Sequence, residues 1–173
     1  MALMQPWATV PARAGGSGAL LPVVPGTNGD VAFDSTRSGN QDVWIAGADG
    51  SNPTQLTSNS AGDLDPTWSP DGTQIAFTSY RTGNGDLYVI DADGTNVTQL
   101  TSGGAFDGEP AWSPDGTQIA FSSTRSGNLD IWLLTIATGA TTQLTTDTRD
   151  DFAPAWKPDG SWPWAASRRI TKP

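Results

Sequence analysis

The sequence of 173 residues contains no cysteine and no histidine. Without cysteine, the chain can form no disulfide, no thiolate nucleophile and no Cys/His zinc site. Without histidine, a Ser-His-Asp triad is excluded as well. Any hydrolytic activity would therefore have to rest on carboxylates and an oxygen-ligated metal.

Basic residues are scarce, and they are unevenly placed. The chain has nine Lys and Arg against 18 Asp and Glu, a net charge of −9. Residues 21–160 hold all 18 acidic residues but only five basic ones, so this segment carries a net charge of −13. Such a field repels nucleic acid and anionic membranes and attracts cations and basic partners. We therefore expect no nucleic-acid partner and no membrane partner.

The N-terminal segment lacks the pattern of a signal peptide. It has no basic n-region, and its apolar stretches are interrupted by Pro6, Pro11 and the Gly15-Gly16 pair. We expect neither a signal peptide nor a membrane span, and we interpret residues 1–20 as a flexible leader.

What the sequence does contain is a repeat. WSPDGTQIAF occurs at 68–77 and recurs letter for letter at 112–121, which is a step of 44 residues. The same step relates the QLT triplets at 55–57, 99–101 and 143–145. The units run over 22–65, 66–109 and 110–153, with a partial copy at 154–169. Residues 161–173 form a degenerate tail. A period of this length indicates a repeat architecture.

Each unit is expected to fold as four short strands. In the central unit these are 66–68, 74–79, 86–91 and 97–100, separated by the turns SPDG and ADG and by the loop at 81–85. Tandem antiparallel meanders of this kind are typical of β-propeller blades. The predicted fold is therefore all-β, with about three four-stranded blades per chain.

The repeat also resembles a known family. The string P-x-W-S-P-D-G-T-x-I-A-F-x-S-x-R-x-G-N-x-D, followed by A-D-G and Q-L-T, is similar to the repeat of TolB-like propellers over residues 29–160. This resemblance implies a propeller, usually of six blades, with an acidic channel that serves partner peptides and a parent protein that is often periplasmic. The compartment of this chain itself stays unknown.

Three blades are too few for a closed ring, since propellers have four to eight. An open stack would expose strand edges to water. We therefore predict a homodimer that closes a six-bladed ring, in which residues 154–156 supply the innermost strand of the partner's first blade. The alternative is a fragment of a longer propeller.

Acidic side chains lead into each predicted innermost strand, at Asp63 and Asp65, at Asp107 and Glu109, and at Asp151. Because innermost strands line a propeller's axis, a dimer would gather these side chains at the channel mouth. Clustered carboxylates recruit cations, and calcium prefers oxygen ligands. These five residues are the candidate calcium site. In the alternative interpretation, each Asp caps its own loop through backbone amides.

Three arginines each stand five residues before an aspartate. We predict structural ion pairs within the blades, with anion binding as the alternative. The predicted pairs are Arg37–Asp42, Arg81–Asp86 and Arg125–Asp130. The recurrent tryptophans at 68, 112 and 156 are expected to pack between blades.

Three functions follow from these observations. The first is a binding module whose acidic channel binds calcium and a peptide or basic partner. The alternative is a calcium-dependent, promiscuous hydrolase of esters, lactones or phosphotriesters, in which Asp63, Asp107 or Asp151 holds the metal or acts as base. The third is a structural fragment without activity.

Overall fold

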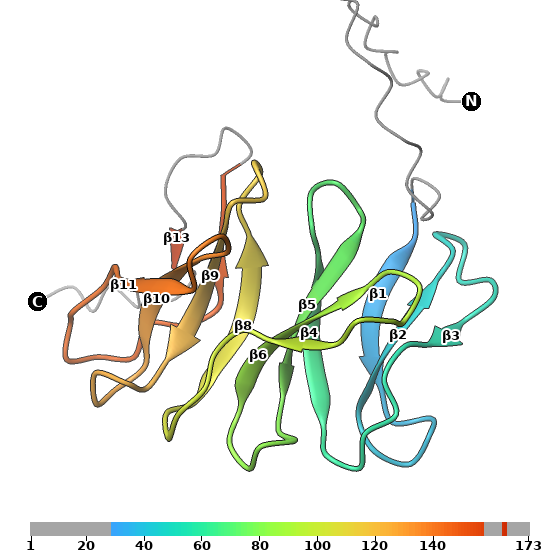
Figure 1. Ribbon diagram of the computed structural model, residues 1–173, viewed down its shortest axis with the longest axis horizontal. Helices are drawn as coiled ribbons and strands as arrows, with labels where there is room; N and C mark the ends of the chain where they lie inside the picture. Colours follow the sequence, from blue (N-terminus) through green and yellow to red (C-terminus); the bar gives the residue numbers. More distant parts are fainter. Residues whose placement is uncertain (1–28, 158–163, 166–173) are drawn as a thin grey trace, which may run out of the picture.

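The computed structural model describes residues 29–157 and 164–165. The predicted leader at 1–20 and most of the tail at 161–173 lie outside the described residues. Within them, the chain forms antiparallel sheets that stand side by side (Figure 1). Residues 29–157 and 164–165 contain no helix that is long and apolar enough to cross a membrane.

Three meanders follow one another along the chain. The first has three strands, which are β1 (Val31–Ser35), β2 (Asp42–Ala46) and β3 (Thr54–Gln55). The second has four, which are β4 (Asp63–Trp68), β5 (Gln74–Ser79), β6 (Asp86–Asp91) and β7 (Thr98–Gln99). The third also has four, which are β8 (Asp107–Trp112), β9 (Gln118–Ser123), β10 (Asp130–Thr135) and β11 (Ala140–Gln143). The predicted partial propeller is thus confirmed, with three sheets of three or four strands.

The SPDG sequence makes the tight turn between β4 and β5. Ser69 donates its hydroxyl to Asp71 at 2.6 Å, and its backbone N–H donates to the Gln74 carbonyl at 2.8 Å. Gly72 has φ of 69°, a left-handed conformation that glycine adopts without a steric penalty. The same contacts recur in the third sheet, so identical sequence produces an identical turn.

The innermost strands begin earlier than predicted. β5 and β6 have the predicted bounds, but β4 starts at Asp63 instead of Pro66. A β-bulge between Leu64 and Thr67 carries the chain past Asp65, whose φ is 53°. The acidic segment is therefore part of the innermost strand, and the first complete blade begins at Asp63.

The hydrophobic core lies between the sheets. One cluster joins Val43 of the first sheet to Ile75, Phe77, Tyr88 and Ile90 of the second. A second cluster joins the second sheet to the third. Both faces of β5 and β6 are buried, because each alternate set of side chains packs against a different neighbouring sheet. Trp68 packs against the first cluster and Trp112 against the second, which agrees with their predicted place between blades.

The chain then begins a fourth blade. β12 (Pro154–Ala155) contacts β8 and β9 and pairs with β13 (Trp164–Ala165). Ala155 lies opposite Trp164, as Ala111 lies opposite Ala120 one repeat earlier. The backbone register of the repeat thus continues into the tail, although its sequence pattern fails after Gly160.

Candidate functional site

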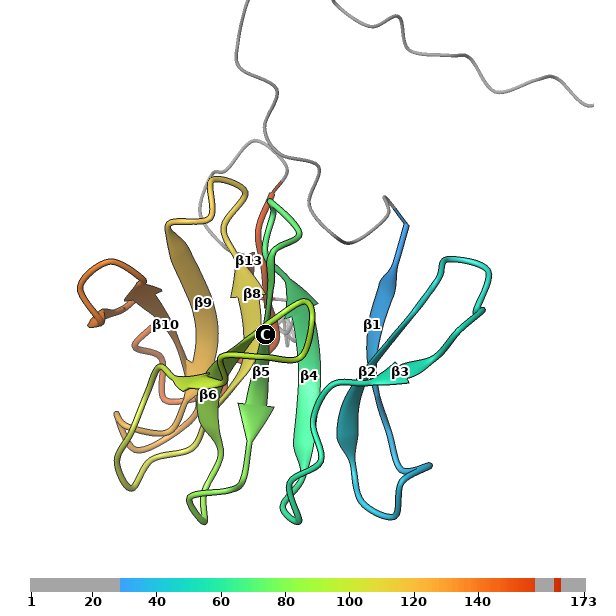
Figure 2. The ribbon, with the colours of Figure 1, turned by 45° about the vertical axis from the view of Figure 1, so that its right-hand side comes forward.

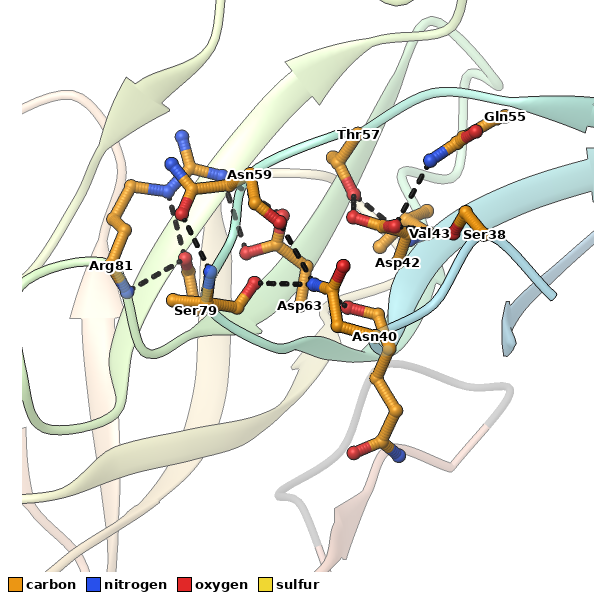
Figure 3. A network of polar contacts seen from close by, with 12 residues as sticks. Ser38, Asn40, Asp42, Val43, Gln55, Thr57, Asn59, Asp63, Ser79 and Arg81 are labelled. Carbon is orange, nitrogen blue, oxygen red and sulfur yellow. Dashed lines mark hydrogen bonds and ion pairs between the residues drawn. The ribbon is translucent and has the colours of Figure 1, made fainter. Parts of the chain in front are cut away.

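Two of the predicted metal ligands, Asp63 and Asp107, lie beneath arginine side chains. The Arg81 guanidinium lies 3.1 Å from the Asp63 carboxylate, which is fully buried (Figure 3). Arg125 pairs with Asp107 at 2.7 Å, and the Asp107 side chain is 2% exposed. Both carboxylates are therefore neutralised by a cation of their own blade.

For Arg81 and Arg125, ion pairs form as predicted, but with other aspartates than the predicted ones. The prediction matched Arg81 with Asp86, five residues away, whereas the pair joins residues 18 apart. The antiparallel register explains the difference, because β4 and β5 place Asp63 directly opposite Ser79. Arg81 also donates from Nε to the Ser79 hydroxyl at 2.8 Å. Sequence distance is therefore a poor guide to contact across a hairpin.

Neutral donors surround the aspartates that were expected to pair with arginine. Asp42 accepts hydrogen bonds from Ser38 at 2.6 Å and Gln55 at 2.9 Å, and Thr57 also donates to it (Figure 3). The Thr57 hydroxyl accepts the backbone N–H of Val43 at 2.9 Å. Asp42 therefore connects β3, the outermost strand of the blade, to the start of β2. The predicted pair Arg37–Asp42 is replaced by this network.

The network recurs in the other blades around Asp86 and Asp130. Gln99 and Gln143 donate to these aspartates. Thr101 accepts the N–H of Leu87 at 2.9 Å. Sequence reasoning missed this role of the QLT triplet, although its recurrence at the 44-residue step was the available signal.

Asp65 and Glu109, in contrast, have carboxylates that no arginine neutralises among the described residues. They hold the same bulged position in consecutive blades, with φ of 53° and 54°. Asp65 is exposed and Glu109 half-buried. Thr78 of the preceding blade accepts the Glu109 N–H at 3.0 Å, and Glu109 Oε2 accepts the Ala153 N–H at 2.8 Å. These contacts join neighbouring blades along the inner edge of the stack.

Electrostatics mark Asp65 as a member of an acidic cluster. The residue as a whole is exposed, but its carboxylate is partly desolvated, and this desolvation is the first cause of its raised pKa. Repulsion by the Glu109 and Asp34 carboxylates is the second cause. The inner-edge cluster, defined as Asp34, Asp65 and Glu109, therefore draws one carboxylate from each of three neighbouring sheets.

Four of the five predicted calcium ligands fall into two kinds in the structure. Asp63 and Asp107 are buried and paired, whereas Asp65 and Glu109 remain at the inner edge. Asp151 is half-buried and its N–H donates to the Leu129 carbonyl at 2.7 Å. Within residues 29–157, no three acidic side chains lie in an arrangement that would hold a metal ion.

The same geometry weighs against Asp63 and Asp107 as catalytic bases. A base must reach the substrate, and both carboxylates are covered by guanidinium groups. The described residues thus give no specific support to the hydrolase alternative.

Comparison with known proteins agrees with the fold. No curated protein matches the chain. The solved structure of a TolB-like protein from Agrobacterium tumefaciens is similar, with a TM-score of 0.71 and 28% identity over 76% of this chain and 47% of that one. TolB from Acinetobacter baumannii gives 0.69 and 29%, over 76% and 34%. An oligogalacturonate lyase in complex with manganese shares the fold, with a TM-score of 0.60 and 14% identity over 75% and 40%.

This chain spans less than half the length of the two TolB structures. The family model of the TolB beta propeller domain matches residues 22–109 and 105–173, which is most of the sequence. The chain belongs to the TolB β-propeller domain family.

Proposed function

We propose that the chain is a binding module whose inner-edge cluster receives the cationic side chains of a basic peptide or protein. The observation that carries the proposal is geometric: Asp65 and Glu109 both contact the Thr78 hydroxyl, and no arginine among the described residues neutralises them. The pKa of Asp65 is raised in agreement, first by desolvation and then by repulsion from the Glu109 and Asp34 carboxylates. A bound Lys or Arg side chain would relieve this repulsion and form charge-assisted hydrogen bonds.

The proposed assembly is a homodimer that closes a six-bladed ring. A two-fold ring would bring two copies of the cluster to one channel and double the negative charge that a ligand meets. The net charge of −9 per chain would steer basic partners toward the protein, and more strongly at low ionic strength.

A calcium ion is the second candidate ligand. Asp65 and Glu109 would hold it, since their carboxylates are not covered by arginine, whereas Asp63 and Asp107 do not fit the role. Calcium takes six to eight oxygen ligands, so a site would need further oxygens from the second copy or from water.

Calorimetry with a lysine- and arginine-rich peptide tests the proposal, and a separate titration with calcium chloride tests the metal. We expect peptide binding to weaken with added salt and to be lost in the double variant Asp65→Asn, Glu109→Gln. The matched control is Asp49→Asn, Asp93→Asn, which removes the same charge from exposed turns on the outer side of the blades. Equal loss in both double variants would mean that only net charge matters, and the proposed site would then be wrong.

A further inference from the structure

The first sheet lacks an innermost strand among the described residues. β1 pairs with β2 as β5 pairs with β6, so β1 is the second strand of its blade. β5 has β4 on its other side, and β9 has β8. On the corresponding side of β1, residues 29–157 supply no strand (Figure 2). The edge of β1 is therefore open to a further strand.

The outward side of the first sheet is also uncovered by any of the residues that the structure describes. Val31 occupies the repeat position of Ile75 and Ile119, but it is 50% exposed while both isoleucines are fully buried. The isoleucines are buried because a preceding blade packs on them. Next to Val31, a hollow of about 310 Å³ is lined by Phe33, Arg37 and other residues of the first sheet. In the second and third sheets, the corresponding face is buried in the core, because another blade precedes it.

Ser35 and Trp44 hold the Arg37 side chain in the conformation that pairs with aspartate in the other blades, but the first repeat has no aspartate at the corresponding position. The Arg37 Nε donates to the Ser35 hydroxyl at 3.0 Å, and its guanidinium lies 4.8 Å from the centre of the Trp44 ring. Arg81 and Arg125 have the same contacts in their blades. In those blades the pairing aspartate stands 18 residues before the arginine, whereas Ala19 stands at that distance before Arg37.

The other end of the stack carries an aspartate in the matching position. The Asp151 N–H donates to the Leu129 carbonyl, as those of Asp63 and Asp107 donate to the preceding blade. Among the described residues, the Asp151 carboxylate accepts no hydrogen bond and forms no ion pair within 4 Å, and its one attraction to a cation is the longer-range one to Arg149, which itself pairs with Asp147. β12 follows directly and is anchored by Trp156, whose Nε1 donates to the Ala111 carbonyl at 2.9 Å.

We propose that β12 of one chain pairs with β1 of a second copy, and that Asp151 forms an ion pair with the partner's Arg37. Extending the register of the complete blades places Ala155 opposite the partner's Ala32 and Asp151 opposite the partner's Ser35. Each copy would complete the other's first blade, twice per two-fold dimer. The inference rests on the homodimeric ring proposed above and names the residues that close it.

Two segments of the same chain compete for these positions. β13 pairs with β12 at the edge that the partner's β1 would use, and Arg169 stands 18 residues after Asp151. The segment 22–24 is the repeat copy of an innermost strand for the first blade. Neither segment supplies Arg37 with a carboxylate at the position that Asp63 and Asp107 hold in the complete blades. Asp151 of a second copy does supply one.

An engineered disulfide tests the strand pairing, because the natural chain has no cysteine to interfere. The double variant Ala32→Cys, Ala155→Cys should form covalent dimers on mild oxidation, seen on a non-reducing gel. The control Thr67→Cys, Ala76→Cys places the same registered pair within one chain and should form a disulfide in the monomer band. A cross-link in the control but not in the test variant would overturn the proposed strand pairing.

Charge reversal tests the ion pair. By light scattering across a dilution series, Arg37→Asp and Asp151→Arg should each weaken dimerisation at least about tenfold, and the two together should restore it. Arg169→Asp should leave the dimer intact. A monomeric wild type would make both the ring and this inference wrong. A dimer insensitive to Arg37→Asp would leave the ring standing and overturn the Asp151–Arg37 contact. A loss caused by Arg169→Asp alone would assign Asp151 to its own chain.

Discussion

The carboxylate of Asp107 lies 2.7 Å from the guanidinium of Arg125, where β8 and β9 run antiparallel. Asp107 is almost fully buried, and Ser123 donates a second hydrogen bond to it. The pair joins the innermost strand of the blade to the loop after the second strand, and Asp63 with Arg81 repeats the arrangement.

Removal of the arginine should therefore destabilise the fold. We expect Arg125→Ala to lower the free energy of unfolding by about 2–4 kcal/mol, since it leaves a buried carboxylate without its counter-ion. Urea unfolding monitored by tryptophan fluorescence measures the change. The matched control is Arg149→Ala, because Arg149 pairs with Asp147 at the surface, with 65% and 38% of the side chains exposed. It should have little effect on the free energy of unfolding, because solvent screens an exposed pair. Similar losses in both variants would contradict a structural role for the Asp107 pair.

The QLT threonines offer a second test of what holds a blade together. Thr101→Val removes the hydroxyl that accepts the buried Leu87 N–H, with little change in side-chain shape. Leaving that donor unsatisfied should cost about 1–3 kcal/mol.

Thr98→Val is the control for this experiment, since the Thr98 side chain is exposed and its hydroxyl donates only to the nearby Asn96 carbonyl. Its effect should be close to zero. If Thr101→Val were as mild as Thr98→Val in the same unfolding experiment, the network around Asp86 would not stabilise the blade.

The sequence predicted the repeat elements well because each one depends on local chemistry. Pro70 and Gly72 define a turn, and the short apolar run between Gln74 and Ser79 defines a strand, so both appear where they were expected. The bulge at Asp65 was missed, because it depends on how the inner strand passes the neighbouring blade. Such a constraint has no local signature.

Side-chain partners were predicted less well than strands. Asp86 is five residues from Arg81, yet the hairpin register brings Arg81 to Asp63. Of the acidic residues predicted to line the channel, the structure leaves Asp65, Glu109 and Asp151 without an ion pair to arginine among the described residues. It also adds Asp34, which the repeat alignment could not single out, since Thr78 and Ser122 occupy its position in the later blades.

The aspartate of the SPDG turn should make stability fall in acid. The pKa of Asp115 is lowered, mainly by the hydrogen bond from the Ser113 hydroxyl and then by the Thr117 N–H. A depressed pKa in the folded state stabilises the fold above the unfolded value of 3.8, and this contribution is lost as the pH falls through the folded value. Asp115→Ala should therefore destabilise the protein at pH 7 and have a smaller effect near pH 2. An equal effect at both values would show that charge plays no part.

Asp65 should show the opposite sign. Its pKa is raised, so the folded state holds the charged form at a cost whenever the pH lies above the folded value. That cost disappears as the pH falls below 3.8, where both states are protonated. We expect Asp65→Asn to raise the free energy of unfolding at pH 7, but only slightly, because the residue is exposed and solvent screens the repulsion.

Asparagine also tolerates the left-handed backbone at Asp65, where φ is 53°. This conformational gain does not titrate, so the pH dependence separates it from the electrostatic gain. Urea unfolding of wild type and variant from pH 7 to pH 3 should give a difference that shrinks toward the low end. If the difference in unfolding free energy stayed constant with pH, the Glu109 and Asp34 carboxylates would not repel Asp65 measurably. The inner-edge cluster would then lose the repulsion on which its proposed affinity for cations depends.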